Sequence, residues 1–334
     1  MNILIAGGTG LLGSCAAEVM INHGHQVHAL TLPVSKDLKL PNQMFLHMCN
    51  FITASQDELD GYMKGMDAFI FAAGVDERVE FKPPVSEAYM YYNITPLQRL
   101  LTSAKKMGVK QAVVLGSYFS YFAKTWPHLK LVENHPYIAS RIKQENIAFS
   151  YADDSFSVIV LELPYIFGIQ EGRKPVWSIF VERFAKPHVI FFPKGGTAMV
   201  TTHQVGVAIY HALLYGINGK SYPLVSVNMP WKTMIRHALK AMDMNKSVIT
   251  IPNWLAALGI KSMQKNYTKK GIEPGLNPKT FSKLMTAYTY IDPNLCADLR
   301  LPDDDIVKAI HASMSYAYQI MNQKAEVVDM KDAL

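Results

Sequence analysis

Residues 2–13 read NILIAGGTGLLG, an apolar run followed at once by glycines at every third position. The run Asn2–Ala6 predicts a buried strand, and the amphipathic stretch after the glycines predicts a helix. Gly7 permits a sharp turn off the strand, Gly10 lets the backbone approach a diphosphate, and Gly13 lets the helix pack closely on the strand. The N-terminus of that helix would face an anion with unbonded N–H groups. The stretch therefore predicts a dinucleotide-binding loop.

Strand-like and helix-like segments alternate through the first half of the chain. Strands are predicted at Asn2–Ala6, Gln26–Leu30, Gln43–Met48, Ala68–Phe71, Ala112–Leu115 and Ser157–Leu161. Helices are predicted at Leu12–His23, Gln56–Lys64, Ser86–Met107 and Ile138–Tyr151. Repeated βα units of this kind predict an α/β fold of Rossmann type, with a doubly wound parallel sheet and helices on both faces.

The alternation weakens after Pro164 and indicates two parts. We expect a Rossmann domain at 1–165 and a smaller C-terminal substrate lobe at 166–334, with a segment near 200–227 returning to the Rossmann sheet. Further helices are predicted at Val205–Tyr215, Thr233–Met242 and Asp305–Met321, and a strand at Ser221–Val227. The amphipathic stretch Asn253–Gln264 predicts a core helix of the lobe, with a lipid or partner surface as the alternative. The polar tail from Gln323 is expected to fray.

Composition excludes several classes of protein. The chain has 334 residues, of which 49% are hydrophobic and 18% charged, as in globular proteins. No apolar run is long enough for a membrane span, and the start lacks a basic leader, which predicts a cytoplasmic protein. The scattered Cys15, Cys49 and Cys296 predict neither a disulfide framework nor a metal site. The net charge of +6 comes without a basic, aromatic-interleaved stripe, so we expect anionic small ligands rather than nucleic acid.

The glycine loop belongs to a wider resemblance. GGTGLLG resembles the fingerprint of the extended short-chain dehydrogenase/reductase family, also called NAD-dependent epimerase/dehydratases. In order along the chain, the segments 65–74, 93–110, 113–117 and 163–168 also resemble the family. The resemblance covers about residues 1–225. It implies a Rossmann fold, NAD or NADP as cofactor and a small-molecule substrate. It also implies a possible homodimer through the helices Ser86–Met107 and Ile138–Tyr151.

The resemblance implies hydride transfer at a carbon that bears oxygen. In the family a tyrosine is the acid or base, a serine or threonine hydrogen-bonds the oxygen, and a lysine four residues after the tyrosine lowers its pKa. The matching tyrosine is Tyr137, and the matching hydroxyl is Ser117, with Ser120 as the alternative. Arg141 occupies the lysine position. Since residues four apart share a helix face, we expect Arg141 beside Tyr137, where its charge would favour the phenolate.

The resemblance also implies which residues hold the cofactor. They are Gly7, Thr9, Gly10, Leu11, Leu12, Gly13, Thr31, Lys36, Asn50, Ala72, Ala73, Gly74, Asn93 and Pro164. The stretch Ala29–Lys36 contains no acid to bond the ribose hydroxyls of NAD, and Lys36 is placed to meet a 2′-phosphate. This favours NADP, with NAD as the alternative. Asn50 is expected beside the adenine, and Arg173 and Lys174 are candidates for anion contacts.

Residues of the second lobe indicate the class of substrate. Thr197 stands where nucleotide-sugar members of the family carry an arginine, and His203 and Gln204 replace their paired aspartates. The aromatic surroundings of Tyr165 and Trp177 suit a less polar carbonyl compound. We therefore hypothesise an NAD(P)-dependent oxidoreductase that reduces a ketone or aldehyde of a small molecule. One alternative is a nucleotide-sugar epimerase or dehydratase that retains its cofactor. The other is a non-catalytic dinucleotide sensor, suggested by the arginine at the lysine position.

Overall fold

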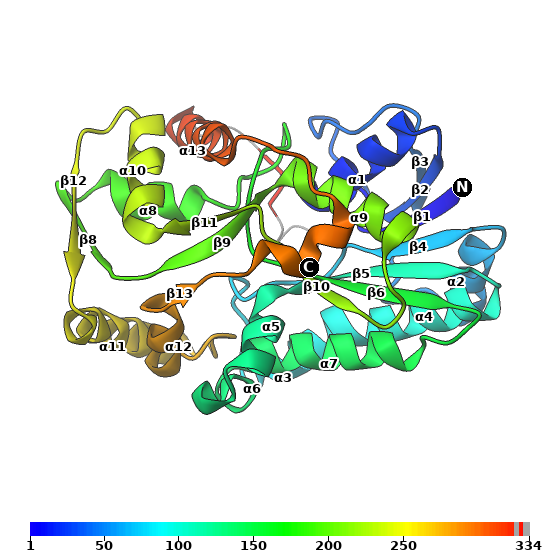
Figure 1. The fold of residues 1–334 in the computed structure, drawn as a ribbon, viewed down its shortest axis with the longest axis horizontal. Coiled ribbons are helices and arrows are strands. Elements are labelled where there is room, and N and C mark those ends of the chain that lie inside the picture. Colours follow the sequence, from blue (N-terminus) through cyan, green and yellow to red (C-terminus); the bar gives the residue numbers. More distant parts are fainter. Residues whose placement is uncertain (324–326, 330–334) are drawn as a thin grey trace.

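The computed structural model describes residues 1–323 and 327–329. Its centre is a seven-stranded sheet in the order β10-β6-β5-β4-β1-β2-β3, in which every neighbouring pair is parallel (Figure 1). The strands are β1 (Asn2–Ala6), β2 (Gln26–Thr31), β3 (Phe45–Met48), β4 (Ala68–Phe71), β5 (Gln111–Ser117), β6 (Ser157–Leu163) and β10 (Ser221–Pro223). The predicted doubly wound parallel sheet is confirmed.

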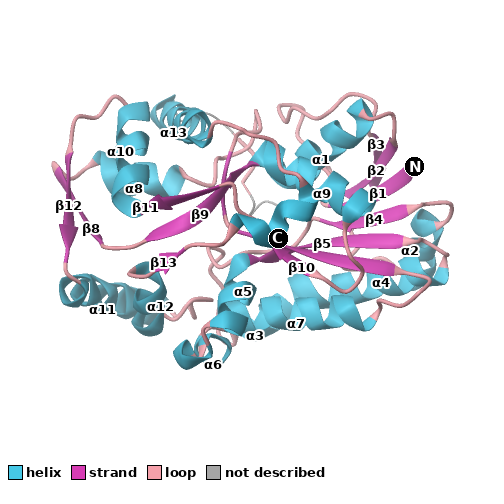
Figure 2. Ribbon diagram, viewed as in Figure 1, coloured by secondary structure: helices cyan, strands magenta, loops and turns pink. Residues whose placement is uncertain are grey.

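Helices cover both faces of this sheet (Figure 2). One face carries α1 (Leu11–Asn22) and α9 (Thr202–Tyr215), and the other carries α2 (Gln56–Met63), α4 (Thr95–Lys106) and α7 (Pro136–Ser150). Alternate residues of β1 belong to different clusters: Ile3 and Ile5 pack with α1 and α9, whereas Leu4 and Ala6 pack with the opposite layer. A strand buried on both sides needs the continuous apolar run that the sequence shows here.

The second lobe has two small sheets. In one, β9 (Gly196–Thr201) pairs with β7 (Tyr165–Phe167), β11 (Val227–Pro230) and β13 (Tyr288–Thr289). In the other, β8 (Val189–Pro193) and β12 (Ser247–Ile251) form a parallel pair. The lobe helices are α8 (Ser178–Ala185), α10 (Trp231–Ala241), α11 (Asn253–Lys270), α12 (Pro278–Met285) and α13 (Ile306–Gln323). The remaining elements are α3 (Val85–Tyr89), η1 (Met90–Ile94), α5 (Tyr118–Thr125), η2 (Pro127–Leu129), α6 (Leu131–Asn134) and η3 (Pro293–Leu299).

Three predicted elements differ from the structure. The single helix expected at Ser86–Met107 is divided into α3, the π-helical η1 and α4, because Pro96 at the start of α4 has no N–H for the preceding turn. The strand expected at Ser221–Val227 is split between β10 in the main sheet and β11 in the lobe. The strand expected at Gln43–Met48 begins only at Phe45, since Gln43 has a φ of 68°.

The stretch expected to form a core helix of the lobe is helical, and none of its side chains that the structure describes belongs to the buried core. It forms the first part of α11, where Trp254, Leu255 and Met263 are exposed. None of the helices described over residues 1–323 meets the length and apolarity that a membrane span requires. The fraying expected from Gln323 falls mostly on residues outside those described. Within them, Val328 forms a bridge with Arg173.

Two buried carboxylates share one exposed lysine where β6 meets α5 and α7. Lys124 Nζ lies 2.7 Å from Glu145 Oε1 and 3.0 Å from Glu162 Oε1. Burial raises the pKa of Glu162 to about 7, and the nearby Glu145 adds to the rise while Lys124 opposes it. One lysine therefore pairs with two carboxylates. Its single positive charge does not fully offset the burial of both negative charges, so the pKa of Glu162 rises.

This cluster predicts that the chain loses stability as the pH rises. The folded pKa of Glu162 lies above its ordinary value of 4.5, so its contribution is complete below pH 4.5 and is lost as the pH rises through 7. We expect Glu162→Gln to gain up to about 3 kcal/mol over the parent at pH 8, and much less at pH 5. Urea unfolding at both pH values measures this. The exposed Glu18→Gln is the control, and an equal effect of both variants would contradict the prediction.

Candidate cofactor and active site

The turn from β1 into α1 is built of backbone in close contact. Gly7 has a φ of 84°, and a Cβ on it would lie 2.7 Å from the carbonyl oxygen of Ala72. A Cβ on Gly13 would lie 2.2 Å from the Gly7 oxygen, so both positions require glycine for packing alone. Gly10 is different, because a Cβ there would meet only the Gly7 oxygen, at 3.2 Å. The absence of a side chain at Gly10 is therefore better explained by a ligand than by the fold.

The loop forms a cradle for an anion. Gly10 is the N-cap of α1 and supplies no side chain to the N–H groups of the first turn, which Leu11 and Leu12 begin. Beside it, the Thr9 and Thr31 hydroxyl oxygens lie 2.8 Å apart, which joins the loop to the end of β2. Unbonded N–H groups at a helix start attract negative charge. This geometry fits the pyrophosphate of a dinucleotide, and the role of Thr31 as a cofactor contact stays a prediction.

A segment distant in sequence lies on the glycine loop. The Thr9 carbonyl accepts hydrogen bonds from Gln170 Nε2 at 3.1 Å and from Arg173 Nη2 at 3.0 Å. Arg173 Nε also donates to Gln170 Oε1 at 2.7 Å. A guanidinium is thus fixed next to the loop that would hold two phosphates. Lys174, the other candidate for an anion contact, pairs instead with Asp329 at 2.9 Å.

Two of the predicted adenosine contacts lie at the outer end of this region. Lys36 is exposed on the loop after β2. Asn50 is exposed after β3, and its Oδ1 accepts a hydrogen bond from the Ile52 N–H at 3.1 Å. Both side chains are accessible to a ligand, and their roles stay predictions.

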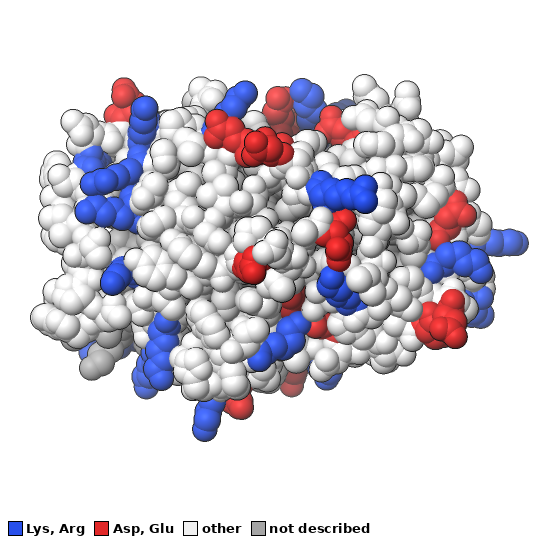
Figure 3. All heavy atoms as spheres, viewed as in Figure 1, with Lys and Arg blue, Asp and Glu red and all other residues white. Residues whose placement is uncertain are grey.

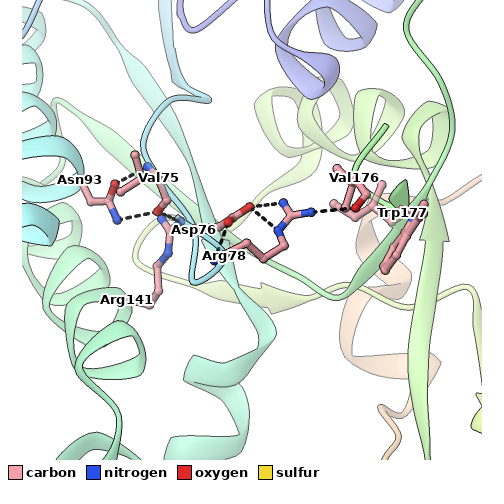
Figure 4. A network of polar contacts seen from close by, with 8 residues as sticks. Val75, Asp76, Arg78, Asn93, Arg141, Val176 and Trp177 are labelled. Atoms are coloured by element: carbon pink, nitrogen blue, oxygen red, sulfur yellow. Dashed lines mark hydrogen bonds and ion pairs between the residues drawn. The ribbon is translucent and has the colours of Figure 1, made fainter. Parts of the chain in front are cut away.

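The loop after β4 is held by a buried asparagine (Figure 4). Asn93 Oδ1 accepts from the Val75 N–H at 2.7 Å, and its Nδ2 donates to the Val75 carbonyl at 2.9 Å. Gly74 has a φ of 117°, and a Cβ on it would lie 2.5 Å from Asn93 Oδ1. Asn93 therefore positions the small-residue segment 72–74 at the end of β4. Pro164 lies buried between β6 and β7, at the same edge of the sheet.

The structure brings Tyr137 and Arg141 together. Tyr137 lies in the first turn of α7 with 4% of its surface exposed, and Arg141 Cζ lies 5.0 Å from the centre of its ring. Arg141 Nη1 donates to Gln144 Oε1 at 2.6 Å, and Nη2 donates to the Val75 carbonyl at 3.3 Å (Figure 4). Its buried Nε has no hydrogen-bond partner among the described residues. The arginine at the lysine position thus links α7 to the β4 loop and keeps one donor for a ligand.

The surroundings of Tyr137 keep its phenol protonated. Burial raises the pKa of Tyr137 to about 12, Arg141 opposes the rise by its charge and by hydrogen bonding, and Glu77 adds to it. The positive charge expected to favour the phenolate is therefore outweighed by loss of water. A phenol that holds its proton at neutral pH is suited to donate it to a carbonyl oxygen that becomes an alkoxide.

Ser117 ends β5 and starts α5. Its Oγ accepts a hydrogen bond from the Phe119 N–H at 3.3 Å, as an N-cap does, and its own proton remains available to donate. The Phe119 ring lies 6.4 Å from the Tyr137 ring, so this strand end borders the tyrosine. Ser120, the alternative, is almost fully buried in α5.

Sequence reasoning missed the charged residues after β4. Arg78 forms an ion pair with Asp76, with Nε to Oδ2 at 3.0 Å, and its Nη1 reaches the Val176 carbonyl at 3.5 Å (Figure 4). Between them, Glu77 has its pKa raised to about 7 by burial and by Asp76, while Arg78 and Arg141 oppose the rise. The only signal was the run of three charges directly after a strand that ends in small residues.

Aromatic side chains line the approach from the lobe. The Tyr89 ring lies 5.6 Å from the Tyr137 ring, and the Tyr89 hydroxyl is buried without a partner among the described residues. Tyr165 stacks on Trp177 at 5.3 Å. Thr197, at the position of the family's arginine, is fully buried, and its hydroxyl lies 3.1 Å from that of Tyr118. The described part of the chain holds no group of three or more His, Cys, Asp or Glu residues suited to a metal ion.

Comparisons with known proteins bear on the family and the fold. A model of the NAD dependent epimerase/dehydratase family matches residues 3–201. A search of curated proteins found no match. Among solved structures, gox2253 is similar over 98% of this chain and 99% of its own, with a TM-score of 0.74 and 17% identity.

Two further structures are similar in fold. UDP-glucuronic acid 4-epimerase from Bacillus cereus, in complex with UDP-glucuronic acid and NAD, is 13% identical with a TM-score of 0.67, covering 96% of this chain and 100% of its own. UDP-N-acetylglucosamine 4-epimerase from Methanobrevibacter ruminantium M1, in complex with UDP-N-acetylmuramic acid, is 14% identical with a TM-score of 0.66, covering 96% and 98%. At these identities the likeness concerns the fold.

The contrast between two glycines gives a test of the cradle. Gly10→Val should fold normally but lose at least about tenfold in dinucleotide affinity, because its side chain enters the space of the pyrophosphate. Gly13→Val should instead destabilise the fold, because its Cβ would collide with the Gly7 carbonyl. Calorimetric titration with NADH and NADPH, together with thermal unfolding, separates the two effects. Equal affinity of Gly10→Val and the parent would show that the loop holds no dinucleotide.

Proposed function

Because the chain belongs to the NAD-dependent epimerase/dehydratase family, we propose that it is an NAD(P)-dependent oxidoreductase that reduces a ketone or aldehyde carbon of a small molecule. The family model matches residues 3–201, which is more than half of the chain. The observation that carries the proposal is the pairing of a buried, protonated Tyr137 with Arg141 at the end of the sheet that bears the glycine loop. Reduction needs a proton donor at the carbonyl oxygen, and this phenol is one at neutral pH.

Each residue of the site has a role in this proposal. The glycine loop and Arg173 hold the phosphates of the dinucleotide, which supplies a hydride when bound. Tyr137 donates its proton to the substrate oxygen, and Ser117 hydrogen-bonds that oxygen as charge develops on it. Arg141 has a second function here, since its charge at 5.0 Å offsets the phenolate left after proton transfer. Its buried Nε is the atom suited to a ribose hydroxyl of the cofactor.

The substrate we propose is less polar than a nucleotide sugar. The Tyr89 ring packs beside Tyr137, and the stacked pair of Tyr165 and Trp177 adds apolar side chains in the lobe. Thr197 cannot replace the family's arginine as a contact to a nucleotide, because it is buried and its hydroxyl is engaged with Tyr118. We also propose the cytoplasm as compartment and a homodimer through α4 and α7, as the family resemblance implies.

A nucleotide-sugar epimerase is the second candidate. It is supported by the similar structures that hold UDP-sugars and NAD. An epimerase must first remove a proton from the sugar hydroxyl, and a tyrosine with a raised pKa is scarcely present at neutral pH as the phenolate that this step needs. Incubation with UDP-glucose and UDP-glucuronic acid, without added cofactor, distinguishes the candidates. Conversion of either sugar to its 4-epimer would favour the epimerase over the reductase.

Substitutions at Tyr137 and Arg141 test the proposed roles. Tyr137→Phe should lower the rate of carbonyl reduction by about 10²–10⁴-fold, because the proton donor is lost, while NADPH affinity changes little. Ser117→Ala should cost less, since only a hydrogen bond is removed. Arg141→Lys should retain or raise activity. A panel of ketones and aldehydes, followed by NADPH absorbance, measures these rates.

The pH profile adds an independent readout. With a pKa of about 12, Tyr137 stays protonated across the neutral range. Deprotonation of Tyr137 should therefore slow the reduction only at strongly alkaline pH. Binding of NADPH by both the parent and Arg141→Lys, without turnover of any carbonyl compound, would instead support a dinucleotide sensor.

Cofactor choice gives a further prediction. The stretch Thr31–Lys36 has no acid to repel a 2′-phosphate, and Lys36 is exposed beside it. NADPH should therefore bind at least as tightly as NADH. Lys36→Gln should weaken NADPH binding and leave NADH binding unchanged, as calorimetry would show. A preference for NADH of about tenfold or more would contradict the choice of NADP without contradicting reduction itself.

A further inference from the structure

The far end of the substrate lobe exposes large apolar side chains that no described element covers. We call it the lobe-end surface and define it by Phe191 of β8, Ile249 of β12, and Trp254, Leu255 and Met263 of α11. Phe191 and Ile249 are direct partners in the β8–β12 pair, with 59% and 46% of their surfaces exposed. Trp254 is 66% exposed. Figure 1 shows these elements at the end of the molecule remote from the seven-stranded sheet.

The fold does not need this apolar face. Ile190, Phe192 and Val248 point inward from the same two strands and are buried in the core of the lobe. A half-buried pair of strands normally alternates apolar residues inside with polar residues outside. Here the two residues that face outward at the middle of the β8–β12 pair, Phe191 and Ile249, are both apolar. Large apolar side chains that face solvent together on paired strands indicate an interaction site.

The charge around the lobe-end surface is strongly positive. Residues 173–291 contain 16 Lys and Arg against 3 Asp and Glu, whereas the rest of the chain contains 17 against 24. Exposed lysines adjoin the apolar face: Lys186 precedes β8, Lys194 follows it, and Lys265 lies in α11. Figure 3 shows blue side chains over the end that holds α10 and β12, with few red ones. Lysines and arginines occur along the whole chain, so the separation appears only when the acidic residues are counted with them.

We propose that the lobe-end surface docks on a lipid bilayer that contains anionic lipids. Apolar side chains with a tryptophan at one end, set among lysines, match the chemistry of a membrane interface. The apolar groups enter the headgroup region while the lysines meet the lipid phosphates. A nucleic acid would use the lysines but leave Phe191 and Ile249 in water, and a neutral protein partner would not use the lysines. The proposal does not depend on the reaction at Tyr137.

Vesicle binding by the purified full chain tests this proposal. The chain should sediment with vesicles of phosphatidylcholine and phosphatidylglycerol, but not with phosphatidylcholine alone, and added salt should release it. Trp177 and Trp231 are buried, and Trp126 packs on Phe122 of α5 outside the lobe, so a blue shift of tryptophan emission on binding should come from Trp254 and disappear in Trp254→Ala. No binding, or equal binding to both kinds of vesicle, would overturn the proposal.

Matched variants locate the surface. Phe191→Ser combined with Ile249→Thr should weaken vesicle binding by about tenfold or more without changing thermal stability, because both side chains already face solvent. Leu214→Ser combined with Ile217→Thr is the control, since these exposed residues lie at the end of α9 and just beyond it. Similar losses in both pairs would overturn the assignment. So would sedimentation equilibrium showing self-association without lipid that only the first pair abolishes, because a second copy would then cover the surface.

Discussion

The carbonyl of Val75 joins the parts of the site. It accepts a hydrogen bond from Asn93 at the π-helical turn η1 and another from Arg141 on α7. One residue before it, Gly74 leaves no room for a Cβ beside Asn93. Two residues further back, the Ala72 carbonyl lies against Gly7. Through this loop the glycine turn, the end of β4 and the tyrosine helix are held in fixed positions. Buried hydrogen bonds of this kind restrict the junction to one geometry.

The choice of arginine at position 141 fits that junction. A lysine side chain has one nitrogen. The guanidinium of Arg141 instead donates hydrogen bonds to Gln144 and to Val75, and its Nε remains without a partner among the described residues. The same guanidinium lies near Tyr137 but does not overcome the effect of burial on the phenol. At neutral pH the phenol therefore keeps its proton. Glu77 adds to this, because its carboxylate disfavours a second negative charge nearby.

The sequence predicted best what local pattern determines. The apolar run Asn2–Ala6, the glycine spacing and the i, i+4 pair on α7 depend on neighbours in the chain, and they were placed correctly in the structure. Contacts between distant residues could not be read in this way. The hydrogen bond of Arg173 to Thr9 joins residues 164 positions apart, and β9 collects strands from three separate segments. The loop Asp76–Arg78 has no periodicity, so only the fold shows that it borders Tyr137.

The segment that follows α11 ties the second lobe to the tyrosine. The Gly275 carbonyl accepts the Tyr137 N–H at 2.9 Å, and Asn277 donates its N–H to His135 at 3.0 Å. A Cβ on Gly275 would lie 1.8 Å from the Tyr89 hydroxyl, so even alanine would displace the rings beside the reacting group. The lobe is consequently not an interchangeable module. A chimera that joined this Rossmann core to a relative's lobe would have to keep residues 273–277 from the parent, because they are as much a part of the surroundings of Tyr137 as of the lobe.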